Sequence, residues 1–408
     1  MRLLIVSQYF WPENFRINDL ASEFVRKGHS VTILTGIPNY PEGKVFQDFR
    51  LSPQRFDVYE GANIVRVPII PRGTRNITLA LNYLSYALSA TTIGAWKLRG
   101  KSFDVIFVFQ LSPVTVGIPG ALFRWLKRAP MVMWVLDLWP ESLVSVGAIQ
   151  SKWILKFVRF LVNSIYKKCD LILAQSRSFI PRIYETANTP WLRVEYFPSW
   201  AEVIFEGGSN DSLPAELANP HGCFTVMFAG NLGVAQDFPA ILEAVEILKG
   251  NGKVRWVILG DGRMGQWLST ELFKRGLSSC VQMLGRFPVE RMPSLYKRAD
   301  ALLVSLRDDP IFAMTIPGKM QSYLAAGIPV LAMLNGEGAD VLKASRAGIA
   351  IPAGDGKALA RAVLEMIAMP KEDRDAMGAN GVAYYRKEFE RSALLSRLEK
   401  CFYSTLRI

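Results

Sequence analysis

Short apolar runs alternate with segments of helical periodicity along this chain, and the alternation stops once before it starts again. The apolar runs of the first series are at 3–6, 31–35, 64–67, 105–109, 131–135 and 171–174. The stretch from 198 to 222 is irregular and is predicted to be a linker. A second series follows at 224–229, 254–259, 281–284, 301–305, 329–333 and 348–351. Strands that alternate with helices form parallel sheets. The sequence predicts an α/β protein with two Rossmann-like, doubly wound parallel-sheet domains that face a cleft.

The length of 408 residues agrees with two domains, which we place at 1–198 and from 199 onward. The formal net charge of +12 suggests an anionic partner, which could be phosphates, nucleic acid or an acidic membrane surface. The four cysteines lie far apart and form no CxxC pair. They are typical of buried thiols in a reducing compartment, and their spacing excludes a disulfide framework or a zinc site.

Neither the start of the chain nor its longest uncharged stretch has the pattern of a membrane-spanning helix. The start of the chain lacks the pattern of a signal peptide. The longest stretch without charge, 76–96, contains hydroxyl and amide side chains that dilute its hydrophobicity. We expect it to form a long helix of the domain that could lie on a membrane but not cross one.

Three loops of the second domain follow strand ends and favour an anion site. The first contains Gly230, Asn231 and Gly233, and glycines allow a diphosphate to approach the backbone closely. Asp237 and Pro239 then resemble the cap and early position of a helix. The third loop precedes an expected helix that starts after Pro317, carries Lys319 in its first turn and stops at Gly327.

The second loop, 260–265, has the pattern G-x-G-x-x-G and contains Arg263. Arg286 follows the next expected strand. An NAD site would have an acidic residue near the position of Arg286 to bind the ribose. Because an arginine stands there, only an NADP site remains as a dinucleotide interpretation, and it depends on Arg286 alone. Because ligands bind at the carboxyl ends of parallel strands, we expect Arg263, Lys319 and the helix N-termini to converge on a nucleotide diphosphate.

Two places in the first domain predict chemistry. Asp137 ends an apolar strand and is followed closely by Glu141, and it could act in the reaction or cap a helix. Glu13, Asn14 and Arg16 open the first helix: Glu13 could meet a substrate, Asn14 could cap the helix, and Arg16 could reach an anion. The two histidines, His29 and His221, are placed poorly for a catalytic base.

The segment 151–168 has the pattern of a basic amphipathic helix. Trp153 and Phe157 are among its apolar residues, and Lys156 and Arg159 are among its basic ones. Such a helix suits an anionic membrane surface, although an ordinary core-facing helix with a basic back would show the same pattern.

Several segments, spread over both halves of the chain, form a specific combination. They are YFWPENFR (9–16), GHSVT (28–32), PNYPEG (38–43), DLWPES (137–142), AGNLG (229–233), GDG (260–262) and IPGKMQSYLAAGIPV (316–330). With these segments the whole chain resembles the family 4 retaining glycosyltransferases of GT-B fold. It is most similar to the bacterial branch of L-fucosamine (N-acetyl-fucosaminyl) transferases of O-antigen and capsule biosynthesis.

The resemblance implies a UDP-sugar donor in the second domain, 199–385, and an acceptor in the first. It also implies that a C-terminal helix, 386–408, returns to the first domain, and that no metal or cofactor is needed. The family has two glutamates where this chain has Met314 and Ser322. Ser322 could still bond a ribose hydroxyl, and Glu337 is a candidate replacement carboxylate.

We therefore expect a retaining transferase that moves a sugar, possibly N-acetyl-L-fucosamine, from a UDP-sugar to a membrane lipid-linked glycan in O-antigen biosynthesis. It would act in the cytoplasm, peripheral on the inner leaflet of an anionic membrane, and would not bind nucleic acid. The alternatives are a UDP-sugar 2-epimerase of the same fold, an NADP-dependent oxidoreductase and a non-catalytic nucleotide-sugar-binding protein.

Overall fold

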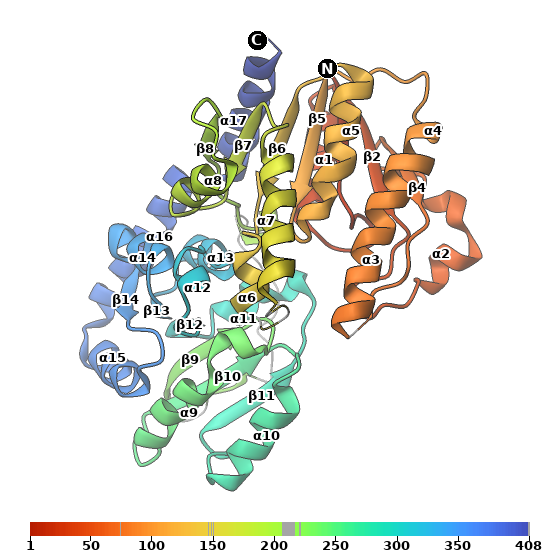
Figure 1. The fold of residues 1–408 in the computed structure, drawn as a ribbon. Helices are drawn as coiled ribbons and strands as arrows, with labels where there is room; N and C mark the ends of the chain where they lie inside the picture. The colour runs from red at the N-terminus through yellow and green to blue at the C-terminus, as the bar shows by residue number, and fades with distance from the viewer. Residues whose placement is uncertain are drawn as a thin grey trace. The chain divides into compact units, whose positions relative to one another are not determined.

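The computed structural model describes residues 1–73, 75–145, 147, 149, 151–205, 217–219 and 222–406. The chain forms two compact units, Met1–Phe197 with Leu395–Ile408 (unit 1) and Pro198–Leu394 (unit 2). Each unit has its own sheet of parallel strands, which confirms the predicted fold class (Figure 1). Much of the predicted linker, and His221 within it, lies outside the described residues.

The sheet of unit 1 has eight strands in the described part of the chain, and all pairs are parallel except the first. Their order across the sheet is β3 (Val58–Tyr59), β4 (Ala62–Val67), β2 (Ser30–Gly36), β1 (Arg2–Val6), β5 (Val105–Gln110), β6 (Met131–Val135), β7 (Leu171–Ala174) and β8 (Val194–Tyr196). The central strands β5 and β6 are buried along their whole length. A strand covered by helices on both faces needs such a continuous apolar run.

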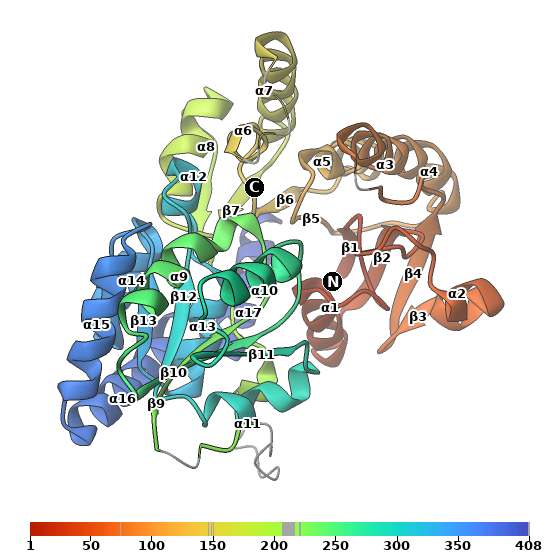
Figure 2. The ribbon, with the colours of Figure 1, turned by 90° about the horizontal axis from the view of Figure 1, so that it is seen from below.

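The helices of unit 1 cover both faces of this sheet. They are α1 (Arg16–Arg26), α2 (Gln47–Leu51), α3 (Asn76–Ser89), α4 (Ala95–Lys97), α5 (Gly117–Lys127), α6 (Glu141–Ser145), α7 (Lys152–Tyr166), α8 (Phe179–Ala187) and the C-terminal α17 (Arg391–Thr405). Figure 2 shows α3, α4 and α5 along one face of the sheet and α1 on the other. The predicted long helix at 76–96 is present as α3 and α4, joined by a π-helical turn at Ala90–Gly94.

The sheet of unit 2 has six strands in the described residues, all paired in parallel. Their order is β11 (Val281–Gly285), β10 (Val254–Leu259), β9 (Phe224–Ala229), β12 (Ala301–Ser305), β13 (Val330–Met333) and β14 (Gly348–Ile351). The helices between and after them are α9 (Phe238–Ile247), α10 (Gly265–Lys274), α11 (Met292–Tyr296), α12 (Pro310–Ala313), α13 (Gly318–Ala326), α14 (Glu337–Ser345), α15 (Gly356–Ala368) and α16 (Lys371–Glu388).

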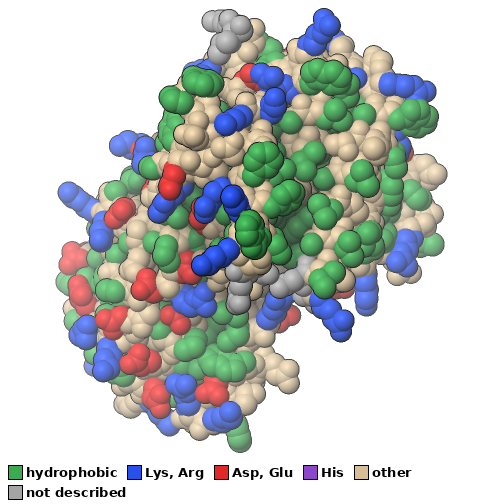
Figure 3. All heavy atoms as spheres, viewed as in Figure 1, with side chains coloured by type: hydrophobic (Ala, Val, Ile, Leu, Met, Phe, Trp, Pro, Cys, Tyr) green, Lys and Arg blue, Asp and Glu red, His purple; other side chains and the backbone are tan. Residues whose placement is uncertain are grey.

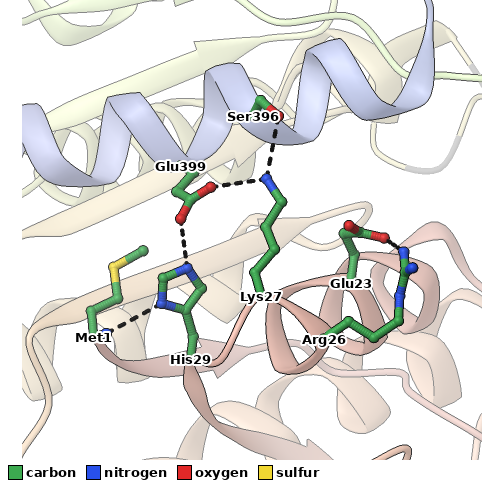
Figure 4. Close-up of polar contacts among 7 residues, drawn as sticks. All are labelled: Met1, Glu23, Arg26, Lys27, His29, Ser396 and Glu399. Carbon is green, nitrogen blue, oxygen red and sulfur yellow. Dashed lines mark hydrogen bonds and ion pairs between the residues drawn. The ribbon is translucent and has the colours of Figure 1, made fainter.

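The C-terminal helix α17 joins unit 1 from Leu395 onward. Phe402 packs against Phe24 of α1 and Phe107 of β5, with ring centroids 5.5 and 5.2 Å apart. Figure 4 shows the polar side of this contact: the Glu399 carboxylate accepts from Lys27 Nζ and pairs with His29 Nε2, both at 2.8 Å. His29 is therefore a buried partner of the C-terminal helix, which agrees with the expectation that it is not a catalytic base.

Candidate functional site

Lys319 lies in the first turn of α13, where the sequence predicts it. Pro317 precedes this helix in an extended conformation, and Gly327 ends it with a left-handed φ of 70°. The Lys319 ammonium lies over the ring of Phe228, the penultimate residue of β9, with Nζ 3.6 Å from the ring centroid. Burial lowers the pKa of Lys319 from 10.5 to about 7. The aromatic face attracts the ammonium, whereas burial disfavours its charge, so an anion bound nearby would restore the charged form.

Gly230 leaves room for this lysine, and two further glycines, Gly260 and Gly262, let the next loop pack closely against the Gly230 loop. A Cβ atom on Gly230 would lie 2.4 Å from Lys319 Cε, and one on Gly260 would lie 1.8 Å from the Gly230 carbonyl oxygen. A Cβ on Gly262 would meet the Leu232 carbonyl oxygen at 2.4 Å. Each of the three also has a positive φ, a conformation that favours glycine. The loops after β9 and β10 are therefore packed backbone to backbone beside Lys319.

Tyr323, one turn after Lys319, fixes α13 to the end of β9. Its hydroxyl accepts from the Ala229 N–H at 3.1 Å and donates to the Ala229 carbonyl at 3.2 Å. Because both bonds go to the residue before Gly230, they hold the lysine and the glycine loop in one register. The sequence did not predict this role of Tyr323, because a tyrosine in a helix of this kind usually packs in the hydrophobic core.

Ser322 is 6% exposed, and its hydroxyl donates to the Glu202 carboxylate at 3.1 Å. Glu202 belongs to the first residues of unit 2, in the stretch that the sequence assigned to the linker. The structure thus places a carboxylate next to the position at which the family resemblance expects one. The sequence pattern could not reveal this contact because it joins residues 120 positions apart.

The other predicted donor-site residues lie at the same sheet edge but are less enclosed. Asn231, Arg263 and Arg286 are exposed. Pro317 and Glu337 are half-buried, with Glu337 at the start of α14. Asp237 occupies the predicted cap position of α9, with a left-handed φ of 50°. Its side chain makes no capping hydrogen bond to the helix.

In unit 1, Asp137 follows β6 at the carboxyl edge of the sheet. Its Oδ2 accepts from Trp139 Nε1 at 3.0 Å, and its carbonyl accepts from Gln110 Nε2 at 2.9 Å. Burial raises the pKa of Asp137 from 3.8 to about 6, although hydrogen bonds from Ser142, Trp139 and Ser112 act in the opposite direction. A carboxylate tuned to this range at a strand end is a candidate for chemistry.

Glu13 is buried, with 3% of its surface exposed, and its carboxylate binds the backbone of two loops. Its oxygens accept from the N–H groups of Phe10 at 3.1 Å, Asn39 at 2.8 Å and Tyr40 at 2.7 Å. Burial raises its pKa from 4.5 to about 7, against the effect of these three bonds. Glu13 therefore ties the loop after β1 to the loop after β2, a positioning contact that the sequence did not predict.

The residues around Glu13 differ from the prediction in one respect. Asn14 does not cap α1: it is exposed, and the cap position is Phe15, which makes no side-chain capping bond. The predicted cap fails because the helix starts at Arg16, one residue too late for an Asn14 cap. Arg16 is half-exposed in the first turn, and Glu141 is half-exposed at the start of α6.

A polar network that sequence reasoning missed lies at the same edge of unit 1. Gln8 Nε2 and the Tyr9 hydroxyl both donate to Asn82 Oδ1, at 2.7 and 3.1 Å. The Arg72 guanidinium donates to the Tyr9 hydroxyl at 3.2 Å and lies over the ring of Tyr40. These side chains come from the loop after β1, the loops after β2 and β4, and helix α3, so only the fold brings them together.

Helix α7 presents both an apolar and a basic surface outward. Trp153 is 80% exposed, and Phe157 is also exposed, as are Lys156 and Arg159. The buried side of α7 is made instead by Val158, Val162, Ile165 and Tyr166. The four membrane residues predicted from the sequence are therefore all on the outer side of the helix.

Helices α3 and α5 also carry exposed apolar residues. On α3 they are Ile77, Leu81, Leu84 and Leu88, and on α5 they are Trp125 and Leu126. Helix α5 lies against α7, since a Cβ on Gly117 of α5 would meet Ile165 of α7 at 2.4 Å. Figure 3 shows hydrophobic side chains gathered over these helices with Lys and Arg around them. We call the exposed residues of α3, α5 and α7 the outer helical face.

No helix in the described part of the chain is both long and apolar enough to span a bilayer. Within the same residues, no three His, Cys, Asp or Glu side chains are grouped in a way that could hold a metal ion. All four cysteines are free; Cys169 and Cys401 are buried, whereas Cys223 and Cys280 are half-exposed, contrary to the expectation of four buried thiols.

Comparisons with known protein families match both halves of the chain. Residues 14–200 match the glycosyl transferase 4-like domain, and residues 223–369 match the glycosyl transferases group 1. The chain is 25% identical over 341 residues to WcaI of Escherichia coli K12, a glycosyl transferase named for colanic acid biosynthesis, with 80% of this chain and 82% of WcaI covered. It is 20% identical over 335 residues to the uncharacterized glycosyltransferase MJ1607 of Methanocaldococcus jannaschii, covering 81% and 78% of the two chains.

Solved structures with the same fold cover nearly the whole chain. Anabaena Alr3699/HepE in complex with UDP and glucose aligns with a TM-score of 0.69 and 14% identity, over 99% of this chain and all of that one. A trehalose-6-phosphate protein from E. coli, bound with UDP-2-fluoro glucose, aligns with a TM-score of 0.71 and 14% identity, over 100% and 99% of the chains. Similarity at this level of identity establishes the two-Rossmann GT-B fold of the chain.

Proposed function

We propose that this chain, which belongs to the glycosyltransferases of GT-B fold whose two domain families it matches, transfers a sugar from a UDP-sugar to a glycan carried on a membrane lipid. The observation that carries the proposal is Lys319, a half-buried cation over Phe228 and beside Gly230 at the carboxyl edge of the unit 2 sheet. This arrangement suits a nucleotide diphosphate better than it suits an uncharged ligand.

The donor is proposed to be a UDP-sugar. Two proteins of the same fold were solved with UDP and glucose or with UDP-2-fluoro glucose, which supports a uridine nucleotide here. Lys319 would neutralise the diphosphate, with the exposed Arg263 and Arg286 and the first-turn N–H groups of α13 around it. Ser322 and Glu202 offer a hydroxyl and a carboxylate for the ribose diol, one turn further along α13. Glu337 is a second carboxylate for this role.

In the reaction, the diphosphate charge that grows on the leaving group is proposed to be stabilised by Lys319 and the N-terminus of α13 without a metal. The resemblance implies retention of configuration, in which the leaving phosphate accepts the proton of the acceptor hydroxyl. Asp137, ionised above a pH of about 6, would orient that hydroxyl. Glu13 would act on the acceptor side as a positioning residue, through the two loops that it joins.

The acceptor is proposed to be lipid-linked, and the outer helical face is proposed to rest on an anionic membrane. Helices α3, α5 and α7 contain no Asp or Glu. Basic residues are present, and three of them, Lys152, Lys156 and Arg159, belong to α7. Exposed tryptophans among basic side chains suit the boundary between headgroups and acyl chains. The chain would then act from the cytoplasmic side as a peripheral protein. Its basic side chains would bind the phosphates of lipid headgroups and not nucleic acid.

The proposed pathway is assembly of a bacterial surface polysaccharide, such as an O-antigen, with N-acetyl-L-fucosamine as one possible sugar. The name of WcaI, which refers to colanic acid biosynthesis, supports a surface-polysaccharide role. The family match disfavours the oxidoreductase and the epimerase as alternatives.

A donor screen tests the proposal. Purified full-length protein is titrated with UDP, GDP and NADP, and UDP-sugars are then assayed for slow hydrolysis and for transfer to lipid-linked acceptors. UDP binding and release of UDP from at least one UDP-sugar are expected. Binding of NADP alone would overturn the proposal.

A further inference from the structure

A tryptophan two residues after Asp137 donates a hydrogen bond to its carboxylate. Both residues lie in the loop between β6 and α6, and the Trp139 indole N–H meets Asp137 Oδ2 at 3.0 Å. Trp139 is buried, with 8% of its surface exposed, whereas Asp137 is half-buried. The bond is therefore shielded from water on the side of the tryptophan, while part of the Asp137 side chain stays at the surface.

This hydrogen bond limits how the carboxylate can turn. An indole has one N–H donor and no acceptor, so it favours the ionised form of the carboxyl group and binds one of its oxygens. The Gln110 side-chain amide donates to the backbone carbonyl of Asp137 at 2.9 Å. Gln110 is itself fully buried at the end of β5. The backbone and the side chain of Asp137 are thus held from two directions.

The indole ring is held in turn by Tyr83 of α3. The two rings meet edge to face, with their centroids 6.2 Å apart and their planes at 63°. Tyr83 is buried as well, so neither ring has solvent beside it to turn into. Aromatic pairs of this kind have a preferred geometry, which fixes the orientation of one ring against the other. Tyr83 therefore acts on Asp137 through Trp139.

Helix α3 is fastened to the rest of unit 1 on both sides of Tyr83. Asn82, the residue before it, donates to the Ile70 carbonyl at 2.6 Å. Tyr86, one turn after Asn82, donates from its hydroxyl to the Leu34 carbonyl at 2.9 Å. Both side chains are fully buried. The contacts from α3 through Tyr83 and the indole to the carboxylate are thus continuous, and they start from a helix that is held in place.

Titratable groups from three helices also face Asp137. After burial, the charge of Glu141 of α6 raises the pKa of Asp137. Burial and then Asp137 raise the pKa of Tyr166 at the end of α7, with Glu141 adding to the effect. Burial raises the pKa of Tyr83 too, where Arg72 acts against it and Asp137 with it. Because burial and Glu141 disfavour the ionised carboxylate, the indole N–H opposes them when it donates to Oδ2.

From these contacts we infer that Trp139 and Tyr83 are positioning residues of the transfer reaction, which fix the direction of the Asp137 carboxylate. The inference rests on the proposed function in one respect, the role of Asp137 towards the acceptor hydroxyl. Neither residue needs to touch the reacting atoms: Trp139 acts through its N–H, and Tyr83 acts through its ring. A purely structural role would require only that the two rings fill the core, so the two roles differ in what the N–H does.

NMR of the full chain with ¹⁵N-labelled tryptophan follows this hydrogen bond without any substrate. Each of the ten tryptophans gives one indole N–H resonance, and the one lost in Trp139→Phe belongs to Trp139. It is expected to shift as Asp137 ionises, with a midpoint at a pH of about 6, and to lose this shift in Asp137→Asn. Trp191→Phe, at an exposed tryptophan, is the control and should remove a different resonance. A Trp139 resonance that does not respond to pH, or responds equally in Asp137→Asn, would overturn the inference.

Two variants of Tyr83 test the second contact. Tyr83→Phe keeps the ring and is expected to give the wild-type titration of Trp139. Tyr83→Leu removes the ring, so the indole can turn, and the amplitude of its pH-dependent shift is expected to fall by about half or more. The remaining indole resonances report whether the variant is folded, and Tyr184→Leu at an exposed tyrosine of α8 is the matched control. A wild-type titration in Tyr83→Leu would overturn the role of Tyr83.

The link to the reaction is tested by release of UDP from UDP-glucose and UDP-N-acetylglucosamine. Trp139→Phe is expected to lower the rate by about tenfold or more, as for loss of a hydrogen bond to a charged group, with UDP affinity unchanged. In a chain that already carries Asp137→Asn, it should cause no further loss, because it acts through that carboxylate. Losses that add up would overturn the inference. A wild type that releases UDP from neither donor would contradict the proposed function instead, and the NMR titrations then decide the positioning contacts by themselves.

Discussion

Gly230 and Lys319 share a space that admits only one side chain. A Cβ atom at position 230 would lie 2.4 Å from Lys319 Cε and 2.8 Å from its Nζ. The lysine therefore reaches the end of β9 only because residue 230 has no side chain. This pairing links a strand end to the first turn of a helix 89 residues later in the chain (319 − 230).

The first prediction is that Gly230→Ala weakens UDP binding by displacing Lys319. The methyl group would push the ammonium away from Phe228, and the φ of 135° at this position disfavours alanine as well. We expect a loss of affinity of about tenfold or more by calorimetry. Gly250→Ala is the matched control, because a Cβ there meets nothing within 4 Å. Equal UDP affinity in both variants would show that Gly230 is not part of the proposed UDP site.

The second prediction concerns pH. The pKa of Lys319 is lowered to about 7, so the ammonium is charged below that pH and loses its proton above it. If only the charged form attracts the diphosphate, UDP affinity is about tenfold weaker at pH 8 than at pH 6. Lys319→Arg should flatten this dependence, because arginine keeps its charge throughout this range. A pH profile that is identical in both proteins would contradict the assignment.

The third prediction is that Asp137→Asn lowers turnover and raises stability at neutral pH. The folded pKa of about 6 lies above the ordinary 3.8, so the ionised carboxylate is disfavoured in the folded protein, and stability is lost as pH rises from about 4 to 6. Removing the charge should therefore raise the thermal midpoint at pH 7.5 by a few degrees, and not at pH 4. UDP affinity should not change. A variant with full transfer activity would exclude Asp137 from the reaction.

The fourth prediction assigns Glu202 to the nucleoside and not to the phosphates. Glu202→Gln should weaken binding of UDP but leave binding of inorganic pyrophosphate unchanged, since the carboxylate bonded to Ser322 would accept from the ribose hydroxyls. Competition between the two ligands for the wild-type protein provides the reference. Equal loss of both would indicate that Glu202 only supports α13.

The fifth prediction concerns the outer helical face. Trp153→Glu with Phe157→Glu should abolish sedimentation with vesicles that contain phosphatidylglycerol, while wild-type binding should weaken as salt rises. Both side chains are exposed, so folding should be unaffected. Phe273→Glu, an exposed aromatic of unit 2, is the control. Undiminished binding of the double variant would exclude α7 as a membrane contact.

The sequence predicted the strands and the bounds of helix α13 well because both depend on local pattern. Buried parallel strands such as β5 and β6 read as unbroken apolar runs, and the start and stop of α13 are marked by Pro317 and Gly327. Lys319 could be selected for the same reason, since its position in the first turn follows from these two residues.

Contacts between distant loops were out of reach of that reasoning. Nothing near Glu202 or Tyr323 in the sequence indicates that one bonds Ser322 and the other Ala229. The three backbone bonds of Glu13 likewise depend on how the loops after β1 and β2 fold together. The Asn14 cap was wrong because a helix start cannot be fixed to one residue from pattern alone.

The most direct test of the donor site is a calorimetric titration of UDP into the wild-type chain and into Lys319→Met, which removes the charge but keeps an apolar side chain over Phe228. The account predicts saturable UDP binding to the wild type and a loss of about 100-fold or more in the variant, as for removal of a buried charge partner. Thermal midpoints of the two proteins should agree. Equal UDP affinity in both, or binding of NADP in place of UDP, would contradict it.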